Sequence, residues 1–401
     1  MSLNNTPSSE RLHIGIFGRR NAGKSSVINA IAGQDLAIVS DVKGTTTDPV
    51  SKTMELLPLG PVVLIDTPGL DDVGELGGLR IRKAYQMLNK TDIAVLVIDA
   101  SVGMTGEDRR ILEKIKEKEI PFVIVWNKCD LENGPNYSSP AKKDIYEENS
   151  ICVSARTGEN IHELKELIAK QTPHEKNERH IVFDLIAPND FVVLVVPIDS
   201  SAPKGRLILP QQQTIRDILD AGASAIVVKD TELADTLHKL GRLTKLVVTD
   251  SQVFKQVSAI VPQEIPLTSF SILFARYKGS LSTVVHGAGA LDELKDEDLV
   301  LISEGCTHHR QCDDIGTVKL PNMVRRYTGK DIQFSFTSGT EFPDNLSKYK
   351  MIIHCGGCML NGREMKYRLK CAKDAGIPIT NYGTAIAHMQ GILERSLEIF
   401  Q

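Results

Sequence analysis

No hydrophobic run in this 401-residue sequence is long enough to cross a membrane. The longest apolar stretch, residues 191–198, has the length of one buried strand, whereas a spanning helix needs about 20 apolar residues. Residues 1–11 are polar and contain no apolar core of the kind found in secretion signals. We therefore expect no membrane association and no export, and we expect the protein to be cytoplasmic.

The sequence also lacks a surplus of positive charge. Its formal net charge is −4 at pH 7, and basic and acidic residues balance within 176–401. A protein that binds RNA or DNA normally carries a basic surface, because phosphate contacts dominate the affinity. This composition does not predict such a surface, so we expect no nucleic-acid partner.

Cysteine is scarce and does not form the pattern of a disulfide-stabilised protein. The chain contains 7 cysteines, and thiols in the cytosol stay reduced. In a chain that is not exported, clustered cysteines more often bind a metal or take part in redox chemistry.

One short segment matches the phosphate-binding P-loop. Residues 18–25 read Gly-x-x-x-x-Gly-Lys-Ser and lie between an expected strand at 12–17 and an expected helix. Glycines let the loop curl around phosphates, its N–H groups point at them, and Lys24 adds a positive charge. The hydroxyl of Ser25 can bind Mg²⁺. The nucleotide-binding residues expected here are Asn21, Ala22, Gly23, Lys24, Ser25 and Ser26.

A second motif, Asp-Thr-Pro-Gly at 66–69, closes an expected strand at 62–65. An aspartate at this point of a P-loop protein belongs to the magnesium site. We therefore expect Asp66 to act with Ser25 on the metal ion, and Gly69 to begin a segment that responds to the γ-phosphate.

Two more motifs predict which base is bound. Asn127, Lys128 and Asp130 follow an expected strand at 121–126. The carboxylate of Asp130 can accept two hydrogen bonds from the edge of guanine, which adenine cannot donate. Ser154, Ala155 and Arg156 follow a fourth strand and can close over the base. Four motifs in this order, each at a strand end, predict a guanine nucleotide and exclude a chance polar turn.

The segment 44–48, Gly-Thr-Thr-Thr-Asp, resembles the first switch of GTPases related to the ribosome-assembly factor Era and the tRNA-modification factor TrmE. This resemblance implies that Thr46 completes the magnesium shell and that Asn21 helps to bind a potassium ion. It also implies that Lys24, Thr46, Asp66 and Gly69 form the catalytic set. Leu70 stands where Ras-like proteins have a water-orienting glutamine, so we expect slow GTP hydrolysis. From the resemblance at Asn21 we expect potassium to stimulate it.

Beyond the GTPase motifs, the pattern predicts two smaller α/β domains with mostly parallel sheets. Strands and helices are expected in alternation, at 191–196, 212–221, 225–228, 232–240, 245–249 and 252–260. Polar segments with prolines separate the domains, which we place at 1–172, 173–264 and 265–401. The middle domain contains no catalytic pattern, and this favours a role in assembly over that of a plain spacer.

Cysteines follow two of the strands expected in the last domain. Cys306 comes after the strand at 299–302, and Cys355 comes after the strand at 351–353. Because the carboxyl ends of parallel strands meet at one edge of a sheet, we expect Cys306, Cys355 and Cys358 to converge. A further strand that ends at Asn381 and Tyr382 would bring these two side chains near them.

Three interpretations of this Cys-x-His and His-Cys-x-x-Cys pattern compete. The first is a set of buried, reduced cysteines, which suits Cys152 and Cys371 better than the clustered residues. The second is a structural zinc site. The third is an iron–sulfur cluster on three thiolates with a weaker fourth position. The spacing does not separate zinc from iron–sulfur.

An Era/TrmE-like GTPase joined to this cysteine–histidine pattern resembles the HydF family, the scaffold GTPases of FeFe-hydrogenase maturation. The resemblance implies a 4Fe–4S cluster on Cys306, Cys355 and Cys358, with His308 and His354 as candidate fourth ligands. It assigns dimerisation to 173–264 and the cluster to 265–401. The implied partners are further copies of the chain, two radical-SAM maturation enzymes and apo FeFe-hydrogenase, which would receive a di-iron precursor.

An alternative function keeps the GTPase and changes the rest. The chain would then be an RNA- or ribosome-associated GTPase of the Era/TrmE kind with a structural zinc site. The balanced charge of 176–401 counts against this alternative.

Overall fold

The computed structural model describes residues 6–33, 50–69, 75–131, 149–172, 180–198, 207–305, 314–339 and 341–401. The chain divides into two compact units, Met1–Asn177 and Glu178–Gln401. Each unit has its own sheets and its own hydrophobic cores. None of the helices in the described ranges is long and apolar enough to cross a membrane.

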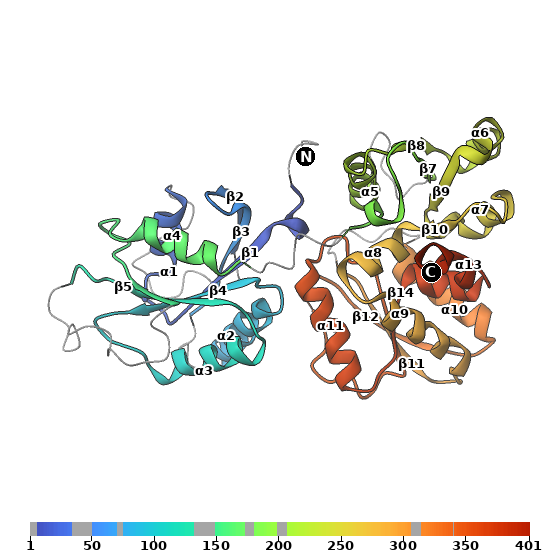
Figure 1. Ribbon diagram of the computed structural model, residues 1–401. Helices are drawn as coiled ribbons and strands as arrows, with labels where there is room; N and C mark the ends of the chain where they lie inside the picture. Colours follow the sequence, from blue (N-terminus) through green and yellow to red (C-terminus); the bar gives the residue numbers. More distant parts are fainter. Residues whose placement is uncertain are drawn as a thin grey trace. The chain divides into compact units, whose positions relative to one another are not determined.

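The first unit contains one six-stranded sheet with the order β2-β3-β1-β4-β5-β6 (Figure 1). β2 runs antiparallel to β3, and the other neighbours are parallel. The strands are β1 (Leu12–Phe17), β2 (Val50–Leu56), β3 (Gly60–Asp66), β4 (Ile93–Asp99), β5 (Phe122–Asn127) and β6 (Ser150–Cys152). The helices are α1 (Lys24–Ala32), α2 (Glu75–Leu88), α3 (Gly106–Glu117) and α4 (Ile161–Lys170).

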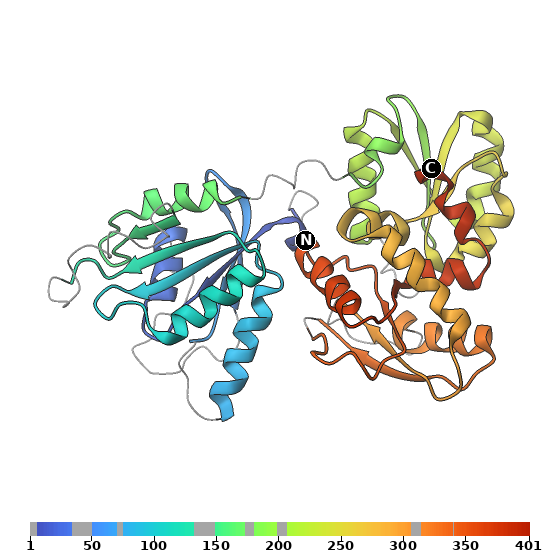
Figure 2. The same cartoon turned by 60° about the horizontal axis from the view of Figure 1, so that its bottom comes forward.

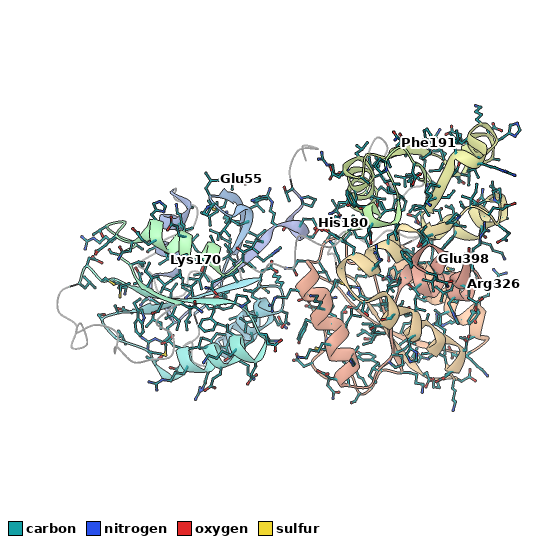
Figure 3. All side chains as sticks on the ribbon, viewed as in Figure 1. Glu55, Lys170, His180, Phe191, Arg326 and Glu398 are labelled. Atoms are coloured by element: carbon teal, nitrogen blue, oxygen red, sulfur yellow. The ribbon has the colours of Figure 1, made fainter. Side chains whose placement is uncertain are left out.

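Helices cover both faces of this sheet, which explains why its central strands are apolar throughout. In β4, Val95 packs with α1 and α4, whereas Leu96 packs with α2 and α3 on the opposite face. A parallel strand that is buried on both faces has no polar positions to alternate with apolar ones. Charged side chains such as Glu55 and Lys170 lie on the outside (Figure 3).

The second unit contains two four-stranded sheets, with the orders β10-β9-β7-β8 and β12-β11-β13-β14. All neighbouring strands in both sheets are parallel. The strands are β7 (Phe191–Val195), β8 (Ser224–Val228), β9 (Thr244–Thr249), β10 (Leu267–Ser269), β11 (Leu299–Ser303), β12 (Gln333–Thr337), β13 (Met351–His354) and β14 (Ile379–Asn381). The helices are α5 (Leu209–Asp220), α6 (Leu233–Leu240), α7 (Phe254–Ile260), α8 (Phe270–Lys278), α9 (Leu281–Ala288), α10 (Leu320–Thr328), α11 (Gly362–Asp374), α12 (Tyr382–Met389) and α13 (Leu393–Leu397).

One helix contributes to the cores of both of these sheets. On the β10-β9-β7-β8 sheet, α5 and α8 cover one face and α6 and α7 cover the other (Figure 2). Phe270 and Phe274 of α8 belong to the core of that sheet, whereas Ala275 packs with residues of the β11–β14 sheet. The end of α8 therefore lies beside the β12-β11-β13-β14 sheet.

The structure confirms the predicted class: an α/β protein with an N-terminal P-loop GTPase fold and two smaller parallel sheets. The strand expected to precede Asn381 is short and includes that residue. The boundary placed between 264 and 265 stays a prediction. β10 comes after that position in the chain and β9 comes before it, yet the two strands pair in one sheet.

Candidate functional site

The segment 18–25 connects β1 to α1 and has a backbone that only glycine can adopt at two positions. Gly18 and Gly23 have φ angles of 142° and 92°. A Cβ atom on Gly18 would lie 2.2 Å from the carbonyl oxygen of Val97, and one on Gly23 would lie 2.2 Å from Nδ2 of Asn127. The loop can therefore stay close to its neighbours and present N–H groups at the start of α1, which is the arrangement that phosphate requires.

Polar side chains of the loop and of β3 meet where the magnesium ion is expected. The buried Lys24 donates from Nζ to the carbonyl oxygens of Gly18 at 3.0 Å and Arg19 at 2.9 Å. The Ser25 hydroxyl donates to Oδ2 of Asp66 at 2.9 Å. Burial raises the pKa of the Asp66 carboxyl, and the Ser25 hydrogen bond and the Lys24 charge partly offset this. A hydroxyl beside a carboxylate is the donor pair that Mg²⁺ takes in P-loop proteins.

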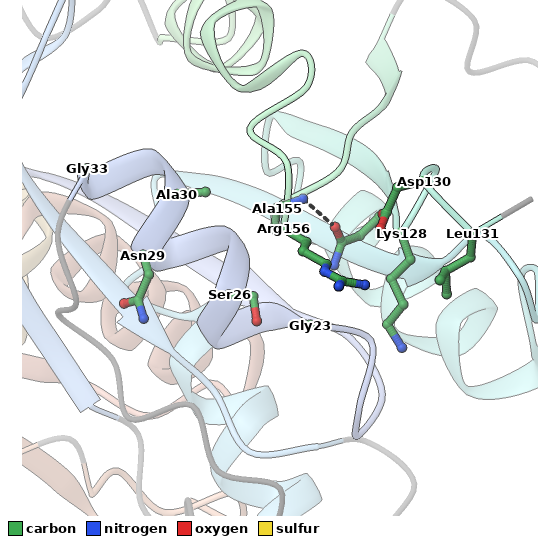
Figure 4. Close-up of a pocket in the computed structure, with 11 residues that line it drawn as sticks. Gly23, Ser26, Asn29, Ala30, Gly33, Lys128, Asp130, Leu131, Ala155 and Arg156 are labelled. Atoms are coloured by element: carbon green, nitrogen blue, oxygen red, sulfur yellow. Dashed lines mark hydrogen bonds between the residues drawn. The ribbon is translucent and has the colours of Figure 1, made fainter.

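The base motif is tied to the phosphate loop by one amide side chain. Asn127 donates from Nδ2 to the carbonyl oxygen of Ala22 at 3.0 Å. Its Oδ1 accepts from the N–H of Ala155 at 3.1 Å, the bond drawn as a dashed line at Ala155 in Figure 4. Beside it, the Ser154 hydroxyl donates to Oδ1 of Asp130 at 2.7 Å. This hydrogen bond orients the Asp130 carboxylate, which stays only half-buried and therefore accessible to a base.

These motifs surround a cavity of about 710 Å³, a size that is typical of small-molecule sites. Lys128, Asp130 and Arg156 lie around one part of it (Figure 4), and Lys128 forms an ion pair with Asp99 at 2.6 Å. The lining residues are Gly23, Ser26, Asn29, Ala30, Gly33, Asn127, Lys128, Asp130, Leu131, Ala155 and Arg156.

The sequence motifs missed part of this lining. Asn29, Ala30 and Gly33 follow Ser26 along and just after α1 at spacings of three and four, so they share one face of the helix. That spacing would have identified them once Ser26 was assigned. Leu131 extends the base motif by one residue.

The structure brings the expected phosphate, magnesium and base residues to one edge of the sheet. Gly69 lies beside the loop, because a Cβ atom on it would be 3.0 Å from the backbone nitrogen of Arg20. Thr46 and Leu70 lie outside the described residues. The individual roles of all these residues in GTP binding and hydrolysis stay predictions.

The second candidate site lies at the carboxyl edge of the β11–β14 sheet. The register pairs Ser303 of β11 with His354 of β13, and His354 with Asn381 of β14, so the strands end in line. Parallel pairing was the condition for the cysteines to converge, and the structure fulfils it. Cys306 and His308 lie outside the described residues, and Gly305 is the last described residue before them.

Backbone N–H groups point at the sulfur of Cys355. Its Sγ accepts from Gly305 at 2.9 Å and from Gly357 at 3.4 Å. Gly357 has φ +64°, and a Cβ atom there would lie 2.6 Å from Sδ of Met365. Burial raises the pKa of the Cys355 thiol to about 11, and the two N–H groups partly offset this. The thiol is therefore protonated at neutral pH, and a metal that binds it must displace the proton.

A buried lysine binds the backbone of the segment that follows Cys355. Lys278, at the end of α8, donates from Nζ to the carbonyl oxygens of Cys358 at 3.3 Å and Leu360 at 3.1 Å. Burial raises the pKa of the Cys358 thiol, and the positive charge of Lys278 partly offsets this. No sequence motif includes Lys278, because it lies 80 residues before Cys358.

Both ring nitrogens of His354 have partners within the protein. Nε2 lies 3.0 Å from Nη1 of Arg368, and Nδ1 contacts the carbonyl oxygen of Cys355. Burial, with the charge of Arg368, lowers the pKa of His354 to about 3. His354 is therefore neutral in this structure.

The two polar residues expected near the cysteines have different roles. The Asn381 side chain accepts from the N–H of Thr384 at the start of α12 and donates to the carbonyl oxygen of Ser271, so it stabilises local structure. The Tyr382 hydroxyl donates to Oε1 of Glu304 at 3.3 Å. The buried Glu304, two residues before Cys306, was missed because a lone glutamate has no sequence signature.

Within the described ranges, no group of three or more His, Cys, Asp or Glu residues is arranged to hold a metal ion. Cys306 and His308 lie outside these ranges. Cys355 and Cys358 occupy one loop at the sheet edge, and the chain enters the segment of Cys306 from Gly305, whose N–H contacts the Cys355 sulfur. This donor set fits a thiolate-bound metal group.

Three family models match successive parts of the chain. The model described as "50S ribosome-binding GTPase" matches residues 13–128. The model described as "Hydrogen maturase F dimerization domain" matches 181–279, and the "Hydrogen maturase F tetramerization domain" matches 282–399. The last two together cover more than half of the chain.

Curated relatives resemble one part of the chain. The tRNA modification GTPase MnmE of Lawsonia intracellularis is 33% identical over 187 residues, which is 45% of this chain and 39% of that protein. MnmE of Aquifex aeolicus is 37% identical over 163 residues, which is 40% of this chain and 35% of that protein. The chain thus spans less than two fifths of the length of these relatives.

Solved structures also resemble part of the chain. Aquifex aeolicus Era bound to GDP and aluminium fluoride is 20% identical, with a TM-score of 0.37 over 58% of this chain and 98% of that one. The G domain of the T. maritima FeoB iron transporter is 23% identical, with a TM-score of 0.30 over 40% of this chain and 98% of that one.

Proposed function

The chain belongs to the hydrogen maturase F family, and on this premise we propose that it is a GTPase and metallocofactor scaffold of FeFe-hydrogenase maturation. It binds GTP with Mg²⁺ in the first unit and a 4Fe–4S cluster in the second. It receives a di-iron precursor made with two radical-SAM enzymes and passes it to apo FeFe-hydrogenase. The family's dimerization and tetramerization domains support a homo-oligomer.

GTP hydrolysis in this proposal works as a switch. Lys24 and the loop N–H groups neutralise the phosphates, Ser25 and Asp66 bind the magnesium ion, and Asp130 selects guanine. Thr46 and the segment after Gly69 order around the γ-phosphate and relax after hydrolysis. The contacts of Lys24 and Ser25 described above support these roles.

Potassium dependence is a prediction for Asn21. Asn21 is an exposed residue of the loop and has a φ angle of 60°, a conformation that asparagine tolerates. Its side-chain oxygen can bind a cation next to the phosphates, where a positive charge stabilises the transition state. We expect GTP hydrolysis to be at least about tenfold faster in KCl than in NaCl, and Asn21→Ala to remove the difference.

Phosphate release measured in the two salts at equal ionic strength tests this assignment. Asn21→Asp, which keeps a side-chain oxygen, serves as the matched control and should keep the potassium effect. Equal rates of the unchanged protein in both salts would refute it.

The cluster would be held by Cys306, Cys355 and Cys358, with His308 as a candidate for the fourth position. One observation carries this part of the proposal: the N–H of Gly305, which precedes Cys306, donates to the sulfur of Cys355 at 2.9 Å. Backbone N–H groups aimed at a cysteine sulfur stabilise thiolates and adjust the potential of iron–sulfur clusters. When bound, the cluster supplies an iron site with an exchangeable ligand.

Metal analysis of anaerobically reconstituted protein tests the proposal. We expect about four iron and four labile sulfide per chain, with an EPR signal after reduction. Stoichiometric zinc without sulfide, together with tight and salt-sensitive RNA binding, would instead support the RNA-associated GTPase.

A further inference from the structure

The fully buried Arg368 contacts both strands that lead into the proposed cluster site. From α11, its Nη1 lies 3.0 Å from the Ser303 hydroxyl, at the end of β11, and 3.0 Å from Nε2 of His354, at the end of β13. These two residues are register partners, so one guanidinium bridges the paired strand ends. In the sequence, Cys355 directly follows His354, and Cys306 comes three residues after Ser303.

The remaining contacts of Arg368 fix its position. Nε donates to Oε1 of Glu364 at 3.0 Å, and Nη2 donates to the carbonyl oxygen of Gly339 at 2.6 Å. The guanidinium carbon lies 5.2 Å from the centre of the Phe342 ring. The Glu364 carboxylate balances the buried charge, so the guanidinium is paired and held from several directions.

This geometry determines which nitrogen of His354 carries the proton. A guanidinium has only donors, so Nε2 of His354 must accept from Arg368. The proton of the neutral ring is then on Nδ1, which donates to the carbonyl oxygen of Cys355. Neither nitrogen keeps a free lone pair with which to bind a metal.

We propose that Arg368 and His354 are positioning residues that hold the ends of β11 and β13 together for the cluster, and that His354 is not a cluster ligand. Arg368 holds the imidazole from one side, and the imidazole fixes the backbone of Cys355 from the other. Only the cluster, the group that is positioned, depends on the proposed function. We call the contacts of Arg368 with Ser303 and His354, and of His354 with Cys355, the clamp.

Three variants separate a clamp from a ligand. His354→Gln keeps an oxygen that can accept from Arg368, whereas His354→Leu keeps the approximate size and loses the acceptor. Arg368→Gln removes the guanidinium. Lys370→Gln, which changes an exposed charge on the same helix, is the matched control.

The iron and sulfide content after anaerobic reconstitution gives the first result. A clamp predicts near-normal content for His354→Gln, and retention about 10–100-fold weaker for His354→Leu and Arg368→Gln. It also predicts the same EPR signal in His354→Gln as in the unchanged protein. If His354 is a ligand, Gln and Leu will have the same effect and the signal of both will change, which overturns the proposal.

Hydrogen exchange of the protein without metal tests the clamp when no cluster forms. The amide of Cys355 donates to the carbonyl oxygen of Ser303 at 3.0 Å, and the clamp encloses this bond. We expect its exchange to be at least about tenfold faster in His354→Leu and in Arg368→Gln, and unchanged in His354→Gln. Normal exchange in His354→Leu refutes the clamp, whereas absence of iron in the unchanged protein refutes only the proposed function.

Discussion

Asp130→Asn is expected to lower the affinity for GTP by a factor on the order of 10⁴ and to raise the affinity for xanthosine triphosphate. The Asp130 carboxylate can accept from two donors on guanine, whereas an asparagine amide offers a donor in place of one acceptor. A buried donor that faces another donor loses its hydrogen bond and gains repulsion. Xanthine has a carbonyl oxygen where guanine has an amino group, and the amide can donate to it.

Because of the contacts of Asp130, this substitution should change the hydrogen-bonding groups that face the base and leave the structure nearly unchanged. Oδ1 accepts from the Ser154 hydroxyl at 2.7 Å, and an asparagine can keep that bond and turn its Nδ2 toward the base. Equilibrium binding of labelled GTP and xanthosine triphosphate is the measurement. Glu163→Gln, an exposed change of the same kind on α4, is the control. Unchanged preference for GTP would refute the assignment of Asp130.

Cys355→Ser is expected to remove nearly all iron and sulfide from the protein and to leave GTP hydrolysis by the first unit intact. A serine hydroxyl is a poor replacement for a thiolate on iron. The N–H groups of Gly305 and Gly357 would remain in place, directed at an oxygen that does not bind the cluster. Iron, sulfide and GTP turnover should be measured on the same preparation.

Cys371→Ser is the matched control for this experiment. Cys371 lies near the end of α11, belongs to neither cysteine motif, and packs at the edge of a hydrophobic core. Its replacement should leave the cluster content near that of the unchanged protein. Retention of a full cluster by Cys355→Ser, or equal losses in both variants, would contradict the assignment.

The phosphate and base sites were predictable because their chemistry is local. The P-loop is one turn in which glycines, a lysine and a serine have fixed spacings, so consecutive letters describe it. β1 was predicted at its observed bounds, since a strand covered on both faces is apolar throughout. β2 was not predicted: it is an edge strand, mostly exposed, and has no hydrophobic pattern to detect.

The supporting residues of the cysteine site could not be predicted in the same way. Arg368 has the same sequence surroundings as Lys366 and Lys370 on α11, but only its side chain is fully buried. Its contacts join residues that are far apart in the chain, and no short pattern describes them. Lys278 is a similar case, because α8 must first pack beside the sheet before its last residue reaches the loop.

The amide of Asn127 has a consequence for the energetics of the nucleotide. It joins the carbonyl oxygen of Ala22 to the N–H of Ala155, and a Cβ atom on Gly23 would collide with it. The two halves of GTP therefore meet surfaces that are not independent. Changes at the phosphate end and at the base end should give non-additive free energies in a double-mutant cycle. In thermodynamic terms, the protein recognises guanosine and triphosphate as one ligand rather than as two fragments.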